Sequence, residues 1–303
     1  MIGYLRAFRW GALVLVLANL CLPARAADLV LDSSSGYTLP VEINGHRLRL
    51  RVDLSASGYI LLNPGTASRI GLNGSMVRSE AWVGPHRLRG GSNATRINVA
   101  GAELRERVAW FDRDAVEGAD GVVSPEVLPY DTITFRLGPP NPNDVETQLT
   151  LFYSKSGGLA LPHPVVGVRM GVDFSIFRAD SIATASAGAL IAAEHGSSWS
   201  GETRAEVISF GIERPVRRMN LARPLLLGRL DLAGFLVRTS DNRGSHTLPP
   251  DTPEDPSEIV VNAQRESRQP PMRMLTVALD RLSRCSSLTY RKPGRQLVLR
   301  CAP

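Results

Sequence analysis

Apolar and polar residues alternate along much of this chain in short runs, which is the pattern of strands with one buried face. The clearest run is HRLRLRV at residues 46–52, where apolar residues alternate with arginines. Asn44-Gly45 stands directly before it, and this pair favours a two-residue hairpin turn because both residues tolerate positive φ. We therefore predict a β-hairpin over residues 37–52 that delivers Asp53 to a loop of small side chains.

Similar short runs, broken by glycine and proline, continue to the end of the chain. Two apolar stretches instead predict short helices, one ending at Gly71 and the other at Gly196. Short strands at regular spacing with few helical patterns are typical of all-β proteins. We therefore predict an all-β fold with few short helices.

The order of these elements repeats along the chain. Each half contains strands, a loop with an acidic residue, a short helix, more strands, and an apolar segment followed by a short helix and further strands. This repeat predicts an N-terminal lobe at residues 27–160 and a C-terminal lobe at 161–303. Residues 242–271 are rich in Pro, Asp and Glu, a composition that predicts an exposed or disordered insertion.

The first 26 residues have the composition of a secretory signal peptide. Arg6 and Arg9 precede the apolar run GALVLVLANLCL, and ARA before Ala27 fits a cleavage site after Ala26. The apolar run is too short to cross a bilayer well, although a retained N-terminal anchor is the alternative. We predict a cleaved signal and a periplasmic or secreted protein with no membrane span after cleavage.

Charge and cysteine content narrow the possible functions. Loss of the signal would lower the formal net charge from +6 to about +3, which is too small to indicate nucleic-acid binding. Cys285 and Cys301 would then be the only cysteines, and Lys292-Pro293-Gly294 between them predicts a turn. We predict a disulfide in an oxidising compartment.

The histidines show no ligand spacing, so we expect no metal and no other cofactor.

The sequence RVDLSAS resembles the catalytic loop of aspartic peptidases of the pepsin and retropepsin type. Their signature is two hydrophobic residues, Asp, Thr or Ser, Gly, and Ala or Ser, and it follows a hairpin of this kind. Asp53 stands at the catalytic position here. Leu54 replaces the Thr or Ser, Ser55 replaces the Gly, and Ala56 follows.

The resemblance implies two similar β lobes with a cleft between them and a second Asp from the C-terminal lobe. An ungapped alignment of the halves, anchored at Gly71 and Gly196, sets Arg178 opposite Asp53. A two-residue gap brings Asp180 there instead, followed by Ser181 and Ile182. Two Asp carboxylates about 3 Å apart would share one proton and activate a water molecule.

Three interpretations follow from these alignments. If Asp180 faces Asp53, the protein is an atypical aspartic endopeptidase. If Arg178 or a neighbour faces Asp53, the two form an ion pair without a shared proton, and the protein binds peptides without cleaving them. A structural or assembly role without a cleft ligand is the third. We favour the second, in which the cleft holds an extended peptide or protein segment by main-chain pairing.

Overall fold

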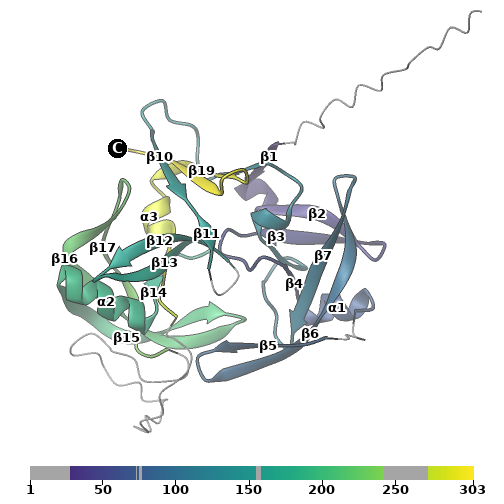
Figure 1. Ribbon diagram of the computed structural model, residues 1–303, viewed down its shortest axis with the longest axis horizontal. Coiled ribbons are helices and arrows are strands. Elements are labelled where there is room, and N and C mark those ends of the chain that lie inside the picture. The colour runs from purple at the N-terminus through teal and green to yellow at the C-terminus, as the bar shows by residue number, and fades with distance from the viewer. Residues whose placement is uncertain (1–27, 73, 75–76, 155–157, 242–271) are drawn as a thin grey trace, which may run out of the picture.

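The computed structural model describes residues 28–72, 74, 77–154, 158–241 and 272–303 (Figure 1). Strands dominate this part of the chain and form three sheets, with a few short helices between them. The predicted all-β fold is therefore confirmed. The predicted signal peptide and the predicted insertion at 242–271 lie outside the described residues.

A seven-stranded sheet builds the first lobe, in the order β2, β3, β8, β4, β7, β6, β5. Its strands are β2 (Thr38–Ile43), β3 (His46–Val52), β4 (Ile60–Leu62), β5 (Val77–Val83), β6 (His86–Val99), β7 (Ala102–Phe111) and β8 (Gly121–Val123). Strands β2 and β3 are the predicted hairpin. At its turn, Asn44 and Gly45 have φ of 51° and 76°, as that type of turn requires.

An eight-stranded sheet builds the second lobe, in the order β11, β12, β13, β18, β14, β17, β16, β15. Its strands are β11 (Phe152–Tyr153), β12 (Leu159–Val165), β13 (Val168–Phe174), β14 (Ile182–Ala183), β15 (Ser197–Ser209), β16 (Ile212–Leu227), β17 (Leu230–Arg238) and β18 (Met274–Val277). The two lobes lie side by side in Figure 1.

A five-stranded sheet joins the two lobes, in the order β1, β9, β19, β20, β10. Its strands are β1 (Asp28–Asp32), β9 (Thr132–Arg136), β10 (Val145–Thr150), β19 (Cys285–Arg291) and β20 (Gln296–Cys301). The pairing of β9 with β19 links the two halves of the chain. Cys285 and Cys301 face each other across β19 and β20 and form the predicted disulfide.

The helices are short and lie between strands. They are α1 (Pro64–Arg69), α2 (Ala185–His195), α3 (Leu279–Leu282) and the 3₁₀ turns η1 (Ser33–Ser35) and η2 (Pro125–Val127). Helix α2 begins after Thr184, whose side chain accepts a hydrogen bond from the Ala187 N–H. It ends before Gly196, which has φ of 71°. Within the described residues, every helix is too short or too polar to cross a membrane.

The lobes repeat one strand arrangement in detail. In the first lobe, β3 runs parallel to β8, β8 antiparallel to β4, and β4 parallel to β7. In the second lobe, β13, β18, β14 and β17 have the same relations. This match allows residues of the two lobes to be equated by strand register rather than by sequence similarity.

One apolar core extends through both lobes and the joining sheet. Its largest fully buried side chains include Phe174 and Phe235 from the second lobe, Ile60 from the first, and Phe135 and Tyr290 from the joining sheet. Burial of this kind stabilises a fold by about 25 cal/mol per Å² of apolar surface. The shared core therefore fixes the position of one lobe against the other.

Candidate functional site

Asp53 follows directly on β3 and is anchored by its backbone. Its N–H donates to the Val123 carbonyl at 3.0 Å. Its Oδ1 accepts hydrogen bonds from the Ser55 N–H at 2.9 Å and the Ser55 hydroxyl at 2.7 Å. The residue is only 6% exposed. The carboxylate orientation is therefore fixed by its own loop.

Strand register places Ser175 at the position equivalent to Asp53. In the first lobe, Val52 pairs with Val123, the last residue of β8. In the second lobe, Phe174 pairs with Val277, the last residue of β18. The residue after each of these strands is Asp53 in one lobe and Ser175 in the other.

Hydrogen bonds around Ser175 repeat those around Asp53. The Ser175 N–H donates to the Val277 carbonyl at 2.9 Å, as the Asp53 N–H does to Val123. The Phe177 N–H donates to the Ser175 hydroxyl oxygen at 3.3 Å, as the Ser55 N–H does to the Asp53 carboxylate. Ser175 is 4% exposed. The second loop thus keeps the geometry of the first, with a hydroxyl where the first has a carboxylate.

Asp180 lies five residues further along and does not occupy the equivalent position. Its carboxylate pairs with Arg204 at 2.7 Å and with Arg218 at 3.7 Å, and its side chain is 30% exposed. The ungapped alignment, which is anchored on the helix ends, sets Arg178 opposite Asp53, and a two-residue gap sets Asp180 there. Because α2 has eleven residues and α1 has six, that anchor displaces the loops.

Arg178 connects this loop to strand β15. Its guanidinium donates to the carbonyls of Val207 and Ile208 at 2.6 and 2.5 Å, and lies 3.8 Å from the Glu206 carboxylate. Burial lowers the pKa of Arg178, while the negative charges of Glu206, Asp173 and Asp53 oppose that shift. Arg178 is therefore near enough to Asp53 to respond to its charge, while its hydrogen bonds go to β15.

The remaining predicted site residues lie in supporting positions. The Ser181 N–H and hydroxyl both donate to Asp280 Oδ1, and the Ala278 N–H donates to the Ser181 hydroxyl oxygen. Ile182 is buried in β14, and Leu54 is buried beside Asp53. The Ala56 N–H donates to the Asp53 carbonyl at 3.1 Å. These residues hold the two loops in place.

Asp173 is a site residue that the sequence interpretation missed. Register equates it with Arg51, because Arg51 pairs with Val122 on β8 and Asp173 with Thr276 on β18. Burial raises the pKa of Asp173 to about 6. The Asp53 charge adds to that rise, whereas a Thr276 hydrogen bond and the Arg178 charge oppose it. Among the residues that the structure describes, its Oδ1 is shielded from solvent and has no hydrogen-bond partner.

Side chains from the two lobes meet beside Asp53. The Arg51 guanidinium lies over the Phe177 ring at 4.2 Å, and its NH2 group lies 3.6 Å from Asp53 Oδ2. Tyr37 packs edge-to-face on Phe177, with ring centroids 5.8 Å apart. These contacts place Asp53 where side chains of the two lobes meet.

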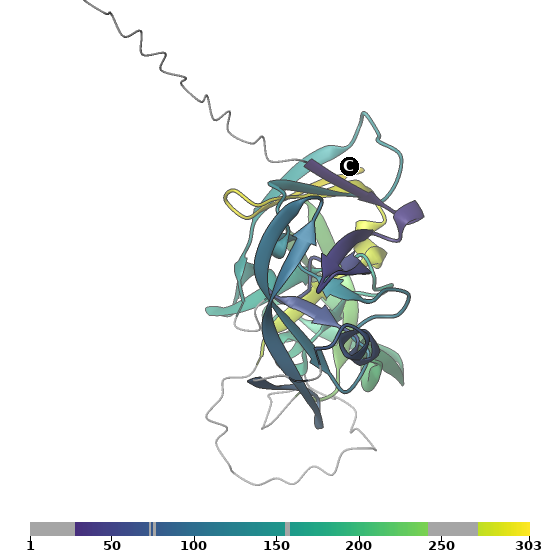
Figure 2. The same cartoon turned by 90° about the vertical axis from the view of Figure 1, so that its right-hand side faces the viewer.

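Two hairpins meet on the side of the molecule away from the joining sheet (Figures 1 and 2). They are β5–β6 from the first lobe and β15–β16 from the second. Val83, Leu88, Phe111 and Ile212 form a small buried cluster there, against which Phe210 packs. Phe111 and Phe210 are edge-to-face with centroids 5.5 Å apart. The hairpins are therefore joined through apolar side chains.

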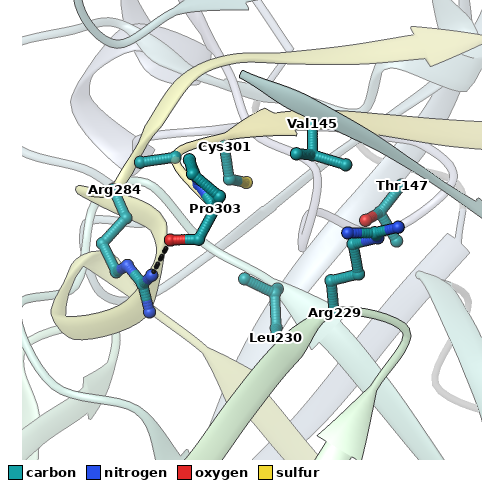
Figure 3. Close-up of a pocket in the computed structure, with 8 residues that line it drawn as sticks. Val145, Thr147, Arg229, Leu230, Arg284, Cys301 and Pro303 are labelled. Atoms are coloured by element: carbon teal, nitrogen blue, oxygen red, sulfur yellow. Dashed lines mark hydrogen bonds between the residues drawn. The ribbon is translucent and has the colours of Figure 1, made fainter. Parts of the chain in front are cut away.

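A separate pocket of about 310 Å³ lies where β10 and β20 approach the β16–β17 turn (Figure 3). Its lining includes Arg229 from that turn and Arg284, whose guanidinium donates to the Pro303 carbonyl oxygen at 2.9 Å. Asp53, Ser175 and Asp180 do not line it. In the part of the chain that the structure describes, no three acidic, His or Cys side chains gather to hold a metal ion.

The sequence matches no protein-family model and no curated protein. Among solved structures, the protease of EIAV, complexed with an inhibitor, is similar at 17% identity and a TM-score of 0.25; the match covers 30% of this chain and 83% of that one. The retroviral protease-like domain of Ddi1 from Leishmania major is similar at 24% identity and a TM-score of 0.23, with 29% and 70% covered. Both matches cover less than a third of this chain.

Proposed function

We propose that this protein is an exported, catalytically impaired relative of aspartic peptidases that holds an extended peptide or protein segment between its lobes. The observation that carries this proposal is the presence of Ser175 at the position equivalent to Asp53. The chemistry of aspartic peptidases needs two carboxylates that share a proton and activate water. A serine hydroxyl is not acidic enough to share a proton with Asp53 in this way.

The strand arrangement supports a peptide as the ligand. β5 and β15 are the terminal strands of their sheets, and their hairpins meet at the same place. A terminal strand has main-chain N–H and C=O groups that an added extended segment can pair with. Arg178, which lies near the Asp53 loop, binds the last residues of β15 through their carbonyl oxygens.

The rival function is an active endopeptidase that uses Asp53 and Asp180. The ion pairs of Asp180 with Arg204 and Arg218 argue against it, because they commit that carboxylate elsewhere. A carboxylate better placed for acid–base chemistry is Asp173, because its pKa is raised and it responds to the Asp53 charge. Any acid-dependent cleavage should therefore require Asp173.

The test is to incubate the purified mature protein with unfolded casein from pH 3 to pH 7. We expect no cleavage at any pH, together with measurable binding of strand-forming peptides. Asp53→Asn, Asp173→Asn and Asp180→Asn serve as matched variants. Cleavage that Asp53→Asn abolishes would overturn the proposal, and the other two variants would then identify the second carboxylate.

Export is tested separately by producing the full chain, with its own N-terminus, in a Gram-negative host. We expect the protein in the periplasmic fraction, and N-terminal sequencing should begin at Ala27. Recovery of an uncut chain from the membrane fraction would instead indicate a retained anchor.

A further inference from the structure

Arg51 is held in a fixed orientation by both lobes. It extends from β3 of the first lobe, and its guanidinium lies 4.2 Å over the ring of Phe177 in the second. Tyr37 packs on that ring and limits its movement. An arginine stacked on an aromatic face keeps the edge of its guanidinium plane available for hydrogen bonds.

The hydrogen-bonding capacity of Arg51 is largely unused. Its Nε is shielded and has no hydrogen-bond partner within the described residues. Its contact with Asp53 is 3.6 Å, which is longer than a hydrogen bond, while Asp53 Oδ1 is already bonded to Ser55. Nearby Arg178 differs, because two carbonyls and Glu206 engage it. Arg51 still has 24% of its side chain exposed.

We infer that Arg51, whose guanidinium lies over the ring of Phe177, is the receptor for a carboxylate side chain of an extended peptide bound between the lobes. This inference rests on the proposed peptide-binding function and names the ligand class. A guanidinium can donate two parallel hydrogen bonds to one carboxylate, which gives both strength and orientation. The contact with Phe177 limits the freedom of the Arg51 side chain and so reduces the entropy that it would lose on binding.

Asp53 is the charged group that acts directly on Arg51, and its carboxylate lies 3.6 Å from the guanidinium. A negative charge at this position disfavours an acidic ligand. Binding of a carboxylate ligand should weaken near pH 4, where the ligand itself becomes protonated.

The probe is a set of acetylated, amidated heptapeptides of sequence Thr-Val-Thr-Xaa-Thr-Val-Thr, in which Xaa is Glu, Gln or Lys. Binding to the whole mature protein is measured by calorimetry at pH 5.5 and 7.5. We expect the Glu peptide to bind about tenfold more tightly than the Gln peptide at pH 5.5, since one good charged pair contributes roughly 1.4 kcal/mol. The Lys peptide should bind most weakly.

Three variants test the role of Arg51 itself. Arg51→Met should abolish the preference for Glu, and Arg51→Lys should retain only part of it because lysine lacks the planar fork. Asp53→Asn should increase the preference, because it removes a negative charge beside the ligand. This gain keeps the inference testable even if Arg51→Met does not fold.

The outcomes separate this inference from the function on which it rests. Equal binding of the Glu and Gln peptides would overturn the role of Arg51 and leave peptide binding intact, whereas binding of no peptide would overturn both. A preference for Glu that survives in Arg51→Met would place the receptor elsewhere. A Gln peptide with a free C-terminus could also bind as tightly as the amidated Glu peptide. In that case the group that Arg51 binds would be a terminal carboxylate and not a side-chain carboxylate.

Discussion

The loops that follow β3 and β13 share a scaffold and differ in chemistry. Each begins after a strand whose last residue pairs with a valine of the neighbouring strand, Val123 in the first lobe and Val277 in the second. In each loop, the backbone N–H of the third residue donates a hydrogen bond to the side chain of the first. The first loop reads Asp53-Leu54-Ser55, and the second reads Ser175-Ile176-Phe177. The comparison teaches that backbone pairing preserves a loop geometry without preserving the acid that such a loop can carry.

A second difference lies two residues earlier on the same strands. Arg51 and Asp173 occupy equivalent positions and have opposite charges. Each is partly neutralised by a neighbour, Arg51 by Asp53 and Asp173 by Arg178. The junction of the lobes thus contains two cations and two carboxylates rather than a matched acid pair. Substitutions at these positions can test that difference.

The largest effect is expected from Ser175→Asp, which makes the two loops alike. If equivalent positions of the two lobes lie opposite each other, a carboxylate at residue 175 should lower the free energy of unfolding at pH 7 by about 3 kcal/mol relative to Ser175→Asn, since mutual repulsion raises the pKa by about two units at 1.36 kcal/mol each. Because the repulsion raises the folded-state pKa of these two carboxylates, the loss of stability should disappear below pH 4, where both are protonated. Urea denaturation at pH 7 and 3.5 measures it. Equal stability of the two variants at pH 7 would show that the loops do not face each other.

A smaller effect is expected from Asp173→Asn. Since burial raises the folded-state pKa of Asp173 to about 6, its ionisation costs stability above pH 6 and none below pH 4. A rise of two pKa units corresponds to about 3 kcal/mol. Because Asp173 is only partly buried, screening by solvent reduces that value, and the variant should be about 2 kcal/mol more stable than the parent at pH 7.5, with no difference at pH 4. Thermal unfolding at both pH values provides the measurement.

Asp180→Asn is the matched control for that experiment. It removes the ion pairs with Arg204 and Arg218 and should lower stability slightly at pH 7.5, by no more than about 1 kcal/mol. If Asp173→Asn also lowered stability at pH 7.5, the attraction between Asp173 and Arg178 would outweigh the cost of burial.

The smallest effects come from the two serines. Ser55→Ala removes a 2.7 Å hydrogen bond to a carboxylate and should cost about 1.5 kcal/mol. Ser175→Ala removes a 3.3 Å bond from a backbone N–H and should cost about 0.5 kcal/mol. Chemical denaturation at pH 7 ranks the two, and the reverse order would contradict the different roles assigned to these side chains.

Local patterns were sufficient to predict much of the fold. The Asn44-Gly45 hairpin, the helix that ends at Gly196 and the Cys285–Cys301 pair all follow from residues close together or from a single plausible pairing. The joining sheet was not predicted, because it pairs strands such as β9 and β19 that lie about 150 residues apart. No local pattern specifies such a pairing.

The second half of the candidate site was misplaced for a related reason. Val52-Asp53-Leu54-Ser55 and Val172-Asp173-Phe174-Ser175 look alike, yet strand register sets them two residues apart. Similarity of sequence would have matched Asp53 with Asp173, and the helix ends suggested Arg178 or Asp180. Only the pairing of β13 with β18 identifies Ser175.

The joining sheet has a consequence for how the molecule gains its stability. Because β9 completes its hydrogen bonds with β19, a first half produced alone would leave one side of β9 bare, with Ile133 and Phe135 uncovered. We expect each separated half to aggregate or to recruit a copy of itself, and the two halves mixed during refolding to recombine. The chain should therefore unfold as one cooperative unit, despite its two-part construction.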